Sequence, residues 1–207
     1  MQAFLTRFSR HILAAAAIAT TLAGCATSTV NLSGATVGAY RDTIDLNGRI
    51  NVVSQKSDGG REGITAPFSW SQRPGRIEVT MFTPTRQTAA EIVVTPESAT
   101  LTQAGREPRT AKDIDALTQQ TLGYALPVAG LRDWLQGYAV DAQGKRFVAS
   151  PANSNVVTRD GWQLRFTEWQ DKPGANGAPL PKLIRAERGA AGNGGDLSIS
   201  IAILPES

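Results

Sequence analysis

The run APFSWSQRPGRIEVTM occupies residues 66–81. Every second residue on both sides of its central Arg-Pro-Gly is apolar, at Ala66, Phe68 and Trp70 and again at Ile77, Val79 and Met81. This period of two is typical of strands with one buried face, and Pro-Gly is typical of a turn. The run therefore predicts two antiparallel strands joined by a tight turn.

The same alternation extends along the chain in both directions from this hairpin. Further strands are expected over residues 44–52, 90–94, 99–101, 162–166, 183–187 and 197–203. Most of the connections are short, so we expect consecutive strands to be antiparallel neighbours in one sheet.

Two helices are expected to interrupt the strands. Thr110 with Asp113 three positions later resembles a capping box, which places the first helix start at Thr110. The apolar face of this helix would hold Ile114, Leu117, Thr121 and Leu122. The second helix is expected from Pro127 to Gln136, because proline suits the first helical position and Gly137 suits the stop. An antiparallel sheet with one helical interruption predicts an α+β fold.

Residues 1–24 have the organisation of a bacterial export signal. Arg7 and Arg10 precede an apolar stretch, Ile12–Ala19, that is too short to span a bilayer. The stretch runs into Leu22-Ala23-Gly24-Cys25, which is typical of the site where bacterial lipoproteins are lipidated and cleaved. We therefore expect a mature chain that begins with a lipidated Cys25. The following Ala26-Thr27-Ser28 lacks the aspartate that favours inner-membrane retention, so the outer membrane is expected.

Removal of the signal would exclude several kinds of chemistry. His11 is the one histidine and Cys25 the one cysteine of the chain, so the mature protein would have neither imidazole nor free thiol. A Ser-His-Asp triad, a Cys-His dyad and a zinc site built from histidine or cysteine are then excluded. Loss of two of the 21 basic residues, against 18 acidic ones, leaves a nearly neutral chain with no signature of nucleic-acid binding.

The predicted organisation is a signal at residues 1–24, a lipidated flexible tether at 25–40 and one domain at 41–207. The tether is expected because the residues after Cys25 are small and polar up to about Ala39.

Two features that suggest enzyme chemistry have simpler explanations. The glycine-rich run at 189–195 lies between two strand patterns, whereas a phosphate loop needs a following helix, so we expect a hairpin loop. Asp113 and Asp115 lie at the start of a helix, where the helix dipole stabilises acidic residues. We therefore predict no enzymatic activity, no metal and no cofactor.

The aromatic residues fall on the inward side of the expected elements. Phe68, Trp70, Trp134, Trp162 and Phe166 fit a packed core, and they fit equally well the wall of a cavity under a curved sheet. Periodicity gives the same pattern in both cases, so both interpretations stay open.

Several of these segments together resemble the LolB family of outer-membrane lipoproteins. The resemblance rests on the lipidation site, on Phe68-Ser69-Trp70 with the following Arg76–Val79, on the Thr83-Pro84 loop, and above all on LPVAGLRDWLQG at residues 126–137. The strands from Trp162 to Ile203 are also similar. The resemblance covers about residues 46–203.

The resemblance implies a half-barrel of about eleven strands, covered by a helical lid that encloses an apolar cavity. Such a receptor would be a monomer on the periplasmic face of the outer membrane. It would accept lipoproteins from a soluble LolA-type carrier by their acyl chains and insert them into that membrane. The residues expected to line the cavity are Phe68, Trp70, Ile77, Val79, Met81, Ile92, Val94, Leu117, Leu131, Trp134, Leu135, Trp162, Leu164, Phe166 and Ile199.

One loop departs from the family pattern. Relatives can carry an exposed leucine directly after the loop proline, where it engages the membrane, but this chain has Thr85 after Pro84. Phe82 is the neighbouring apolar residue that could substitute for it. The residues predicted to engage the membrane are therefore Phe82, Pro84 and Thr85.

Two other functions fit the same patterns. A structural outer-membrane lipoprotein would have a filled core and a functional outer surface. A lipoprotein enzyme would show polar groups converging in a cleft. An apolar cavity of several hundred Å³ would instead favour lipid transfer.

Overall fold

The computed structural model describes residues 34–55, 59–122, 126–189 and 196–205. The predicted signal, the lipidation site and most of the glycine-rich run therefore lie outside the described residues. Among those described, no helix is long and apolar enough to cross a membrane.

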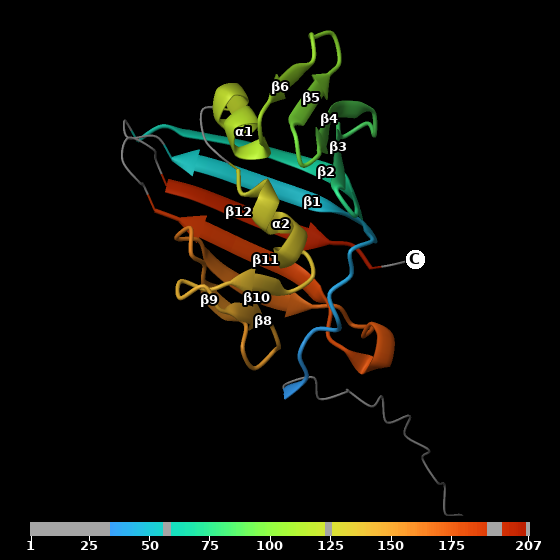
Figure 1. The fold of residues 1–207 in the computed structure, drawn as a ribbon, viewed down its shortest axis with the longest axis vertical. Helices are drawn as coiled ribbons and strands as arrows, with labels where there is room; N and C mark the ends of the chain where they lie inside the picture. The colour runs from blue at the N-terminus through green and yellow to red at the C-terminus, as the bar shows by residue number, and fades with distance from the viewer. Residues whose placement is uncertain (1–33, 56–58, 123–125, 190–195, 206–207) are drawn as a thin grey trace, which may run out of the picture. The chain divides into compact units, whose positions relative to one another are not determined.

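A ten-stranded antiparallel sheet is the main element of the fold (Figure 1). Its strand order is β6-β5-β4-β3-β2-β1-β12-β11-β10-β9. The strands are β1 (Ile44–Gln55), β2 (Arg61–Arg73), β3 (Arg76–Phe82), β4 (Thr88–Val94), β5 (Ala99–Gln103), β6 (Arg109–Ala111), β9 (Asn155–Val157), β10 (Gln163–Trp169), β11 (Pro181–Arg188) and β12 (Asp196–Ile203). A separate hairpin is formed by β7 (Tyr138–Val140) and β8 (Arg146–Val148).

The predicted hairpin at residues 66–81 is confirmed in its register. Phe68 pairs with Met81, Trp70 with Val79, and Gly75 has φ +71° in the turn between the strands. The resemblance implies about eleven strands, and the described residues give ten in the main sheet and two in the separate hairpin. The sheet is not closed, because β6 and β9 are its two edges.

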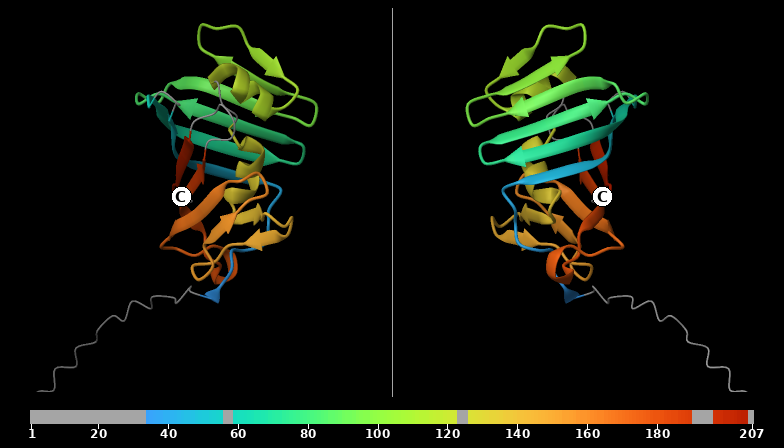
Figure 2. Two further views of the ribbon diagram at one scale, coloured as in Figure 1. Left: turned by 90° about the vertical axis from the view of Figure 1, so that its left-hand side faces the viewer. Right: turned by 90° about the vertical axis from the view of Figure 1, so that its right-hand side faces the viewer.

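Buried and exposed residues alternate along the longer strands. Both helices lie across one face of the sheet (Figure 1), and α2 covers apolar residues of β1–β4 and β12 there. The side views show the sheet curving, so that β3–β5 and β9–β11 run in different directions (Figure 2). The largest buried side chains on this face include Trp70, Phe166 and Ile199. The helices are α1 (Ile114–Leu122) and α2 (Val128–Trp134).

The first helix begins later than the capping box predicts. Thr110 lies in β6, where its hydroxyl is 3.1 Å from the hydroxyl of Thr100 on β5. Asp113 is the residue that caps α1, because its Oδ1 accepts a hydrogen bond of 2.7 Å from the backbone N–H of Ala116. The short strand β6 takes Thr110 out of the helix, so that prediction was wrong.

The second helix is shorter than the predicted range at both ends, and Gly137 lies in the turn that follows it. Pro127 stands just before it, and the backbone N–H of Gly137 donates to the Trp134 carbonyl at 2.9 Å. Gly137 has φ +82°, and a Cβ there would lie 2.5 Å from Cγ1 of Val37. Both facts require glycine at the end of this helix.

The end of the expected tether is packed against the domain. We call residues 37–41 the N-terminal strap. Val37 is 5% exposed and its N–H donates to the Ala149 carbonyl at 2.9 Å. The Tyr40 ring makes an edge contact with Tyr138 at 5.6 Å between ring centres. One buried valine and one tyrosine therefore anchor a segment whose composition is otherwise that of a linker.

Candidate functional site between the sheet and the helices

A small apolar hollow lies between the curved sheet and α2. We call it the inner hollow; its volume is about 50 Å³. It is lined by apolar side chains from β1–β4, β12, α2 and the residues just before α2: Ile50, Phe68, Trp70, Val79, Met81, Ile92, Leu126, Pro127, Val128, Leu131, Leu135, Ile199 and Ile201. A pocket lined in this way can bind a hydrocarbon by removing it from water.

Eight of the fifteen residues predicted for a cavity line the inner hollow. They are Phe68, Trp70, Val79, Met81, Ile92, Leu131, Leu135 and Ile199. The strand residues among them come together because alternate positions of neighbouring antiparallel strands project to the same face.

The other seven predicted residues lie outside the inner hollow. Trp134 and Trp162 pack edge to face, with 5.7 Å between ring centres, and Phe166 stacks between Phe147 and Trp169. Leu117 is 1% exposed on α1. The remaining three, Ile77, Val94 and Leu164, are buried or half-buried on the sheet. The burial and contacts of these seven residues are those of a packed core.

Five lining residues were not among the predicted ones. Ile201 lies two residues after the predicted Ile199, and Ile50 has the same parity as Ile44 and Leu46 in its strand. The same periodicity could therefore have found both. Val128 lies on the helix face that carries Leu131. Leu126 and Pro127 precede α2, and no periodic signal marks residues in such a connection.

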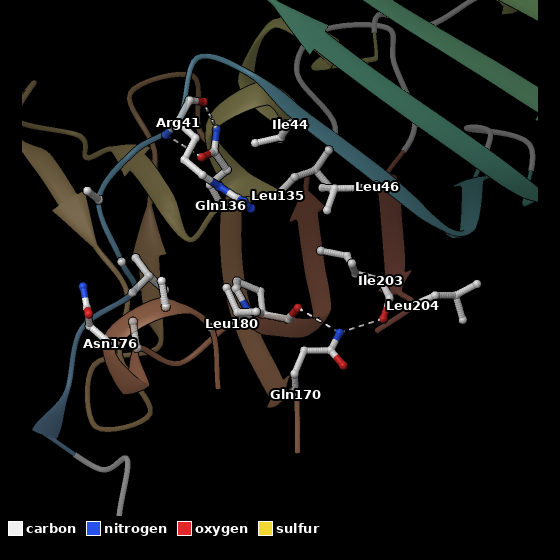
Figure 3. Close-up of a pocket in the computed structure, with 17 residues that line it drawn as sticks. Arg41, Ile44, Leu46, Leu135, Gln136, Gln170, Asn176, Leu180, Ile203 and Leu204 are labelled. Carbon is white, nitrogen blue, oxygen red and sulfur yellow. Dashed lines mark hydrogen bonds between the residues drawn. The ribbon is translucent and has the colours of Figure 1, made fainter. Parts of the chain in front are cut away.

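A much larger hollow shares Leu135 with the inner one. Figure 3 shows the residues that line it. We call it the outer hollow; its volume is about 430 Å³. Apolar residues such as Ile44, Leu46 and Ile203 line it. The hydrophilic side chains in its lining are Arg41, Gln136, Gln170 and Asn176. Gln170 is held in place because its Nε2 donates to the Ile203 carbonyl at 2.9 Å. Pockets for drug-sized ligands span about 300–1,000 Å³, so the outer hollow reaches this range and the inner one does not.

Ionised groups play no part in the lining of the inner hollow. Burial, followed by the neighbouring Asp113 and Asp160, raises the pKa of Asp115 on α1. A hydrogen bond from Arg73 lowers the pKa of Asp45, which is exposed on β1. Among the described residues no group of acidic, histidine or cysteine side chains is placed to hold a metal. The inner hollow therefore offers an apolar environment rather than charge.

The β3–β4 loop is a tight, exposed hairpin. The backbone N–H of Thr83 donates to the Gln87 carbonyl at 2.8 Å, and the Thr83 and Thr85 hydroxyls are 2.8 Å apart. Pro84 and Thr85 are exposed, while Phe82 is half-buried at a register shift that follows Met81. Of the three residues predicted to engage the membrane, two are therefore displayed on the surface and the third is partly covered.

A family model described as outer membrane lipoprotein LolB matches residues 42–203. The chain belongs to this family. The match includes both hairpin strands, both helices and every residue that lines the inner hollow. It begins one residue after the N-terminal strap ends.

Individual members of the family are similar to this chain in sequence over most of their length. The outer-membrane lipoprotein LolB of Cupriavidus metallidurans is 36% identical over 154 residues, which cover 72% of this chain and 74% of the relative. That of Cupriavidus pinatubonensis is 34% identical over 149 residues and covers 72% of each chain. That of Bordetella petrii is 32% identical over 177 residues, covering 84% of this chain and 85% of the relative.

Among solved structures, a LolA superfamily protein from Nitrosomonas europaea aligns with a TM-score of 0.45 at 9% identity. The alignment covers 82% of this chain and 87% of that one.

Proposed function

We propose that this protein accepts lipoproteins from a soluble LolA-type carrier by binding their acyl chains between the sheet and α2, and then inserts them into the outer membrane. The observation that carries the proposal is the inner hollow, whose thirteen lining residues are all apolar and include no ionisable side chain. Membership of a family of outer-membrane lipoproteins supports the same role.

Binding of an acyl chain requires α2 to move. The inner hollow has a volume of about 50 Å³, far below the range of ligand pockets. Its roof is formed by Val128, Leu131 and Leu135 from α2 and its end. Helix α2 has seven residues, and its N-terminal end has no side-chain cap. Displacement of this short helix would open the apolar face of the sheet.

The small volume of the inner hollow also favours the alternative of a structural lipoprotein. A filled interior is what such a protein would have, because close packing stabilises a core with no ligand to hold. Lipid transfer and a structural role therefore differ in one measurable property, which is whether acyl chains reach the inward face of the sheet.

A photo-crosslinking experiment tests this property. A crosslinker at Val79 or Met81, which line the inner hollow, is expected to label an acylated lipoprotein supplied on its carrier. Matched positions on the same sheet are Glu78 and Arg165, which alternate with inward residues. Equal labelling at the inward and alternate positions would contradict the proposal.

The membrane attachment of the protein is part of the same proposal. Lipid on Cys25 would hold the domain at the periplasmic face of the outer membrane, since two or more acyl chains give stable anchoring. The exposed β3–β4 hairpin, with Pro84 and Thr85, would contact the bilayer during release of the client.

A further inference from the structure

The inner and outer hollows lie along the same strands. On β1, Ile44 and Leu46 line the outer hollow and Ile50 lines the inner one. On β12, Ile203 lines the outer hollow and Ile201 the inner one. Leu46 and Ile50 are four residues apart on one strand, or about 13 Å at the usual rise per residue. One apolar track therefore runs from the inner hollow to the outer one.

Leu135 is the residue that lines both hollows. It is 4% exposed and follows directly after α2, and its N–H donates to the Leu131 carbonyl at 3.0 Å. Figure 3 shows it among the apolar residues of the outer hollow, with Ile44 and Leu46. The side chain shared by the two hollows is thus attached directly to the end of the helix that must move.

The sheet side of this partition is filled by Phe68. Gly48 lies between Leu46 and Ile50 on β1, and a Cβ there would lie 2.7 Å from Cε1 of Phe68. Gly48 is also the residue of β1 that pairs with Phe68, so the Phe68 ring covers its own pairing partner. The track is therefore narrowed from the sheet by Phe68 and from α2 by Leu135.

We propose that Leu135 is a gate between two acyl-chain compartments. An acyl chain that enters beneath α2 extends past Leu135 into the outer hollow, which supplies most of the volume. The outer hollow also has exposed hydrophilic side chains, Arg41 and Asn176, which would lie against water. The hydrocarbon would lie against its apolar residues. The size of the side chain at residue 135 then determines how much the binding affinity increases with the length of the acyl chain. This inference rests on the proposed acyl-chain binding.

Binding of two fatty acids of different length tests the gate. Full-length protein carrying Cys25→Ala, which cannot be lipidated, is titrated with octanoic acid and with palmitic acid by calorimetry. Leu135→Trp is expected to weaken palmitic acid binding about tenfold, a loss of about 1.4 kcal/mol, and to change octanoic acid binding much less. Leu135→Ala is expected to strengthen palmitic acid binding, because it joins the two hollows.

A second variant fills the outer hollow from its exposed side. Ala175 lines this hollow from the exposed turn Ala175–Gly177, so Ala175→Trp leaves the core intact. It is expected to weaken palmitic acid binding and spare octanoic acid, even if a Leu135 variant fails to fold. Leu131→Ala is the matched control, because Leu131 lines only the inner hollow and its loss should affect both acids alike.

The outcomes separate the gate from the proposed function. If the unsubstituted protein binds neither acid, the proposal of acyl-chain binding is wrong, and the proposal of a gate is then wrong as well. If it binds both, but the Leu135 and Ala175 variants leave the ratio of the two affinities unchanged, the gate is wrong and acyl-chain binding stands.

Discussion

Trp70 is buried with one hydrogen-bonding group unused. The residue is 2% exposed, and its Nε1–H has no hydrogen-bond partner. An unpaired buried donor costs about 1–3 kcal/mol. Removal of the indole N–H therefore offsets part of the stability that is lost because a phenylalanine ring fills less volume. Trp70→Phe is therefore expected to change the free energy of unfolding by less than about 1.5 kcal/mol.

Urea unfolding of Trp70→Phe and Trp70→Ala measures this difference. The alanine variant loses most of the buried side chain and is expected to cost about 3–5 kcal/mol. A loss in the phenylalanine variant as large as that in the alanine variant would mean that the indole N–H does have a partner.

Asp115 makes stability depend on pH. Burial, with Asp113 and Asp160, raises the pKa of Asp115 above its ordinary value of 3.8. The folded protein then holds this proton more tightly than the unfolded chain, so the contribution to stability is present at acidic pH and is lost as pH rises through the folded pKa. Asp115→Asn is expected to raise the melting temperature at neutral pH.

Thermal unfolding across a pH series checks this sign. The advantage of Asp115→Asn should shrink as the pH falls below 3.8, where the aspartate is protonated in both states. An advantage that stayed constant with pH would assign the effect to a cause other than ionisation.

Helix α1 is capped by Asp113, and not by Thr110, which the sequence predicted as the cap. Asp113 accepts the hydrogen bond from the Ala116 N–H, whereas Thr110 lies on β6. Asp113→Ala is expected to lower the free energy of unfolding by about 1 kcal/mol. Thr110→Ala is the matched control and should cost about 0.5 kcal/mol or less, since Thr110 is exposed. Chemical denaturation of both variants gives the comparison, and a larger cost at Thr110 would reverse the assignment.

The β3–β4 hairpin is expected to act in release rather than in acceptance. Thr85 is exposed at its tip, so Thr85→Leu should leave the fold intact, with a change of about 0.5 kcal/mol or less. The added apolar surface should speed release of lipoprotein into liposomes. Acceptance from a loaded carrier and release into liposomes are measured separately.

Thr102→Leu on β5 is the control for the hairpin, because Thr102 is also exposed but lies away from the loop. A Thr85→Leu protein with altered acceptance and unchanged release would place carrier docking, not membrane contact, at this hairpin.

The elements that the sequence predicts well are those with long alternating runs. The register of Phe68 with Met81 follows from alternation and a Pro-Gly turn. The three-residue strands β6 to β9 are too short to show a period, and β6 displaced the expected helix start. The volume of the inner hollow was beyond prediction, because a packed wall and a cavity wall have the same periodicity. The double role of Leu135 depends on how α2 sits on the sheet, which no local pattern contains.

At the scale of the whole molecule, attachment to the membrane depends on Cys25. Mass spectrometry of the mature N-terminus is expected to find a lipidated Cys25 as the first residue. Cys25→Ala should give a soluble or unprocessed protein, because no acyl chain can be added. An unmodified Cys25 in the mature wild-type protein would exclude the lipid anchor.

The pairing of β1 with β12 also sets the order in which the chain can fold. The two strands lie side by side in the middle of the sheet, with Gly48 opposite Ile203 and Gln55 opposite Asp196. Contacts between residues so distant in sequence form slowly, because closing the long intervening segment costs conformational entropy before the contacts stabilise it. Until residue 196 has emerged, β1 exposes one unpaired edge, and such edges recruit other chains. While β12 is still unpaired, nine of the ten strands are present and β1 lacks its neighbour, so the chain is prone to aggregate at this stage.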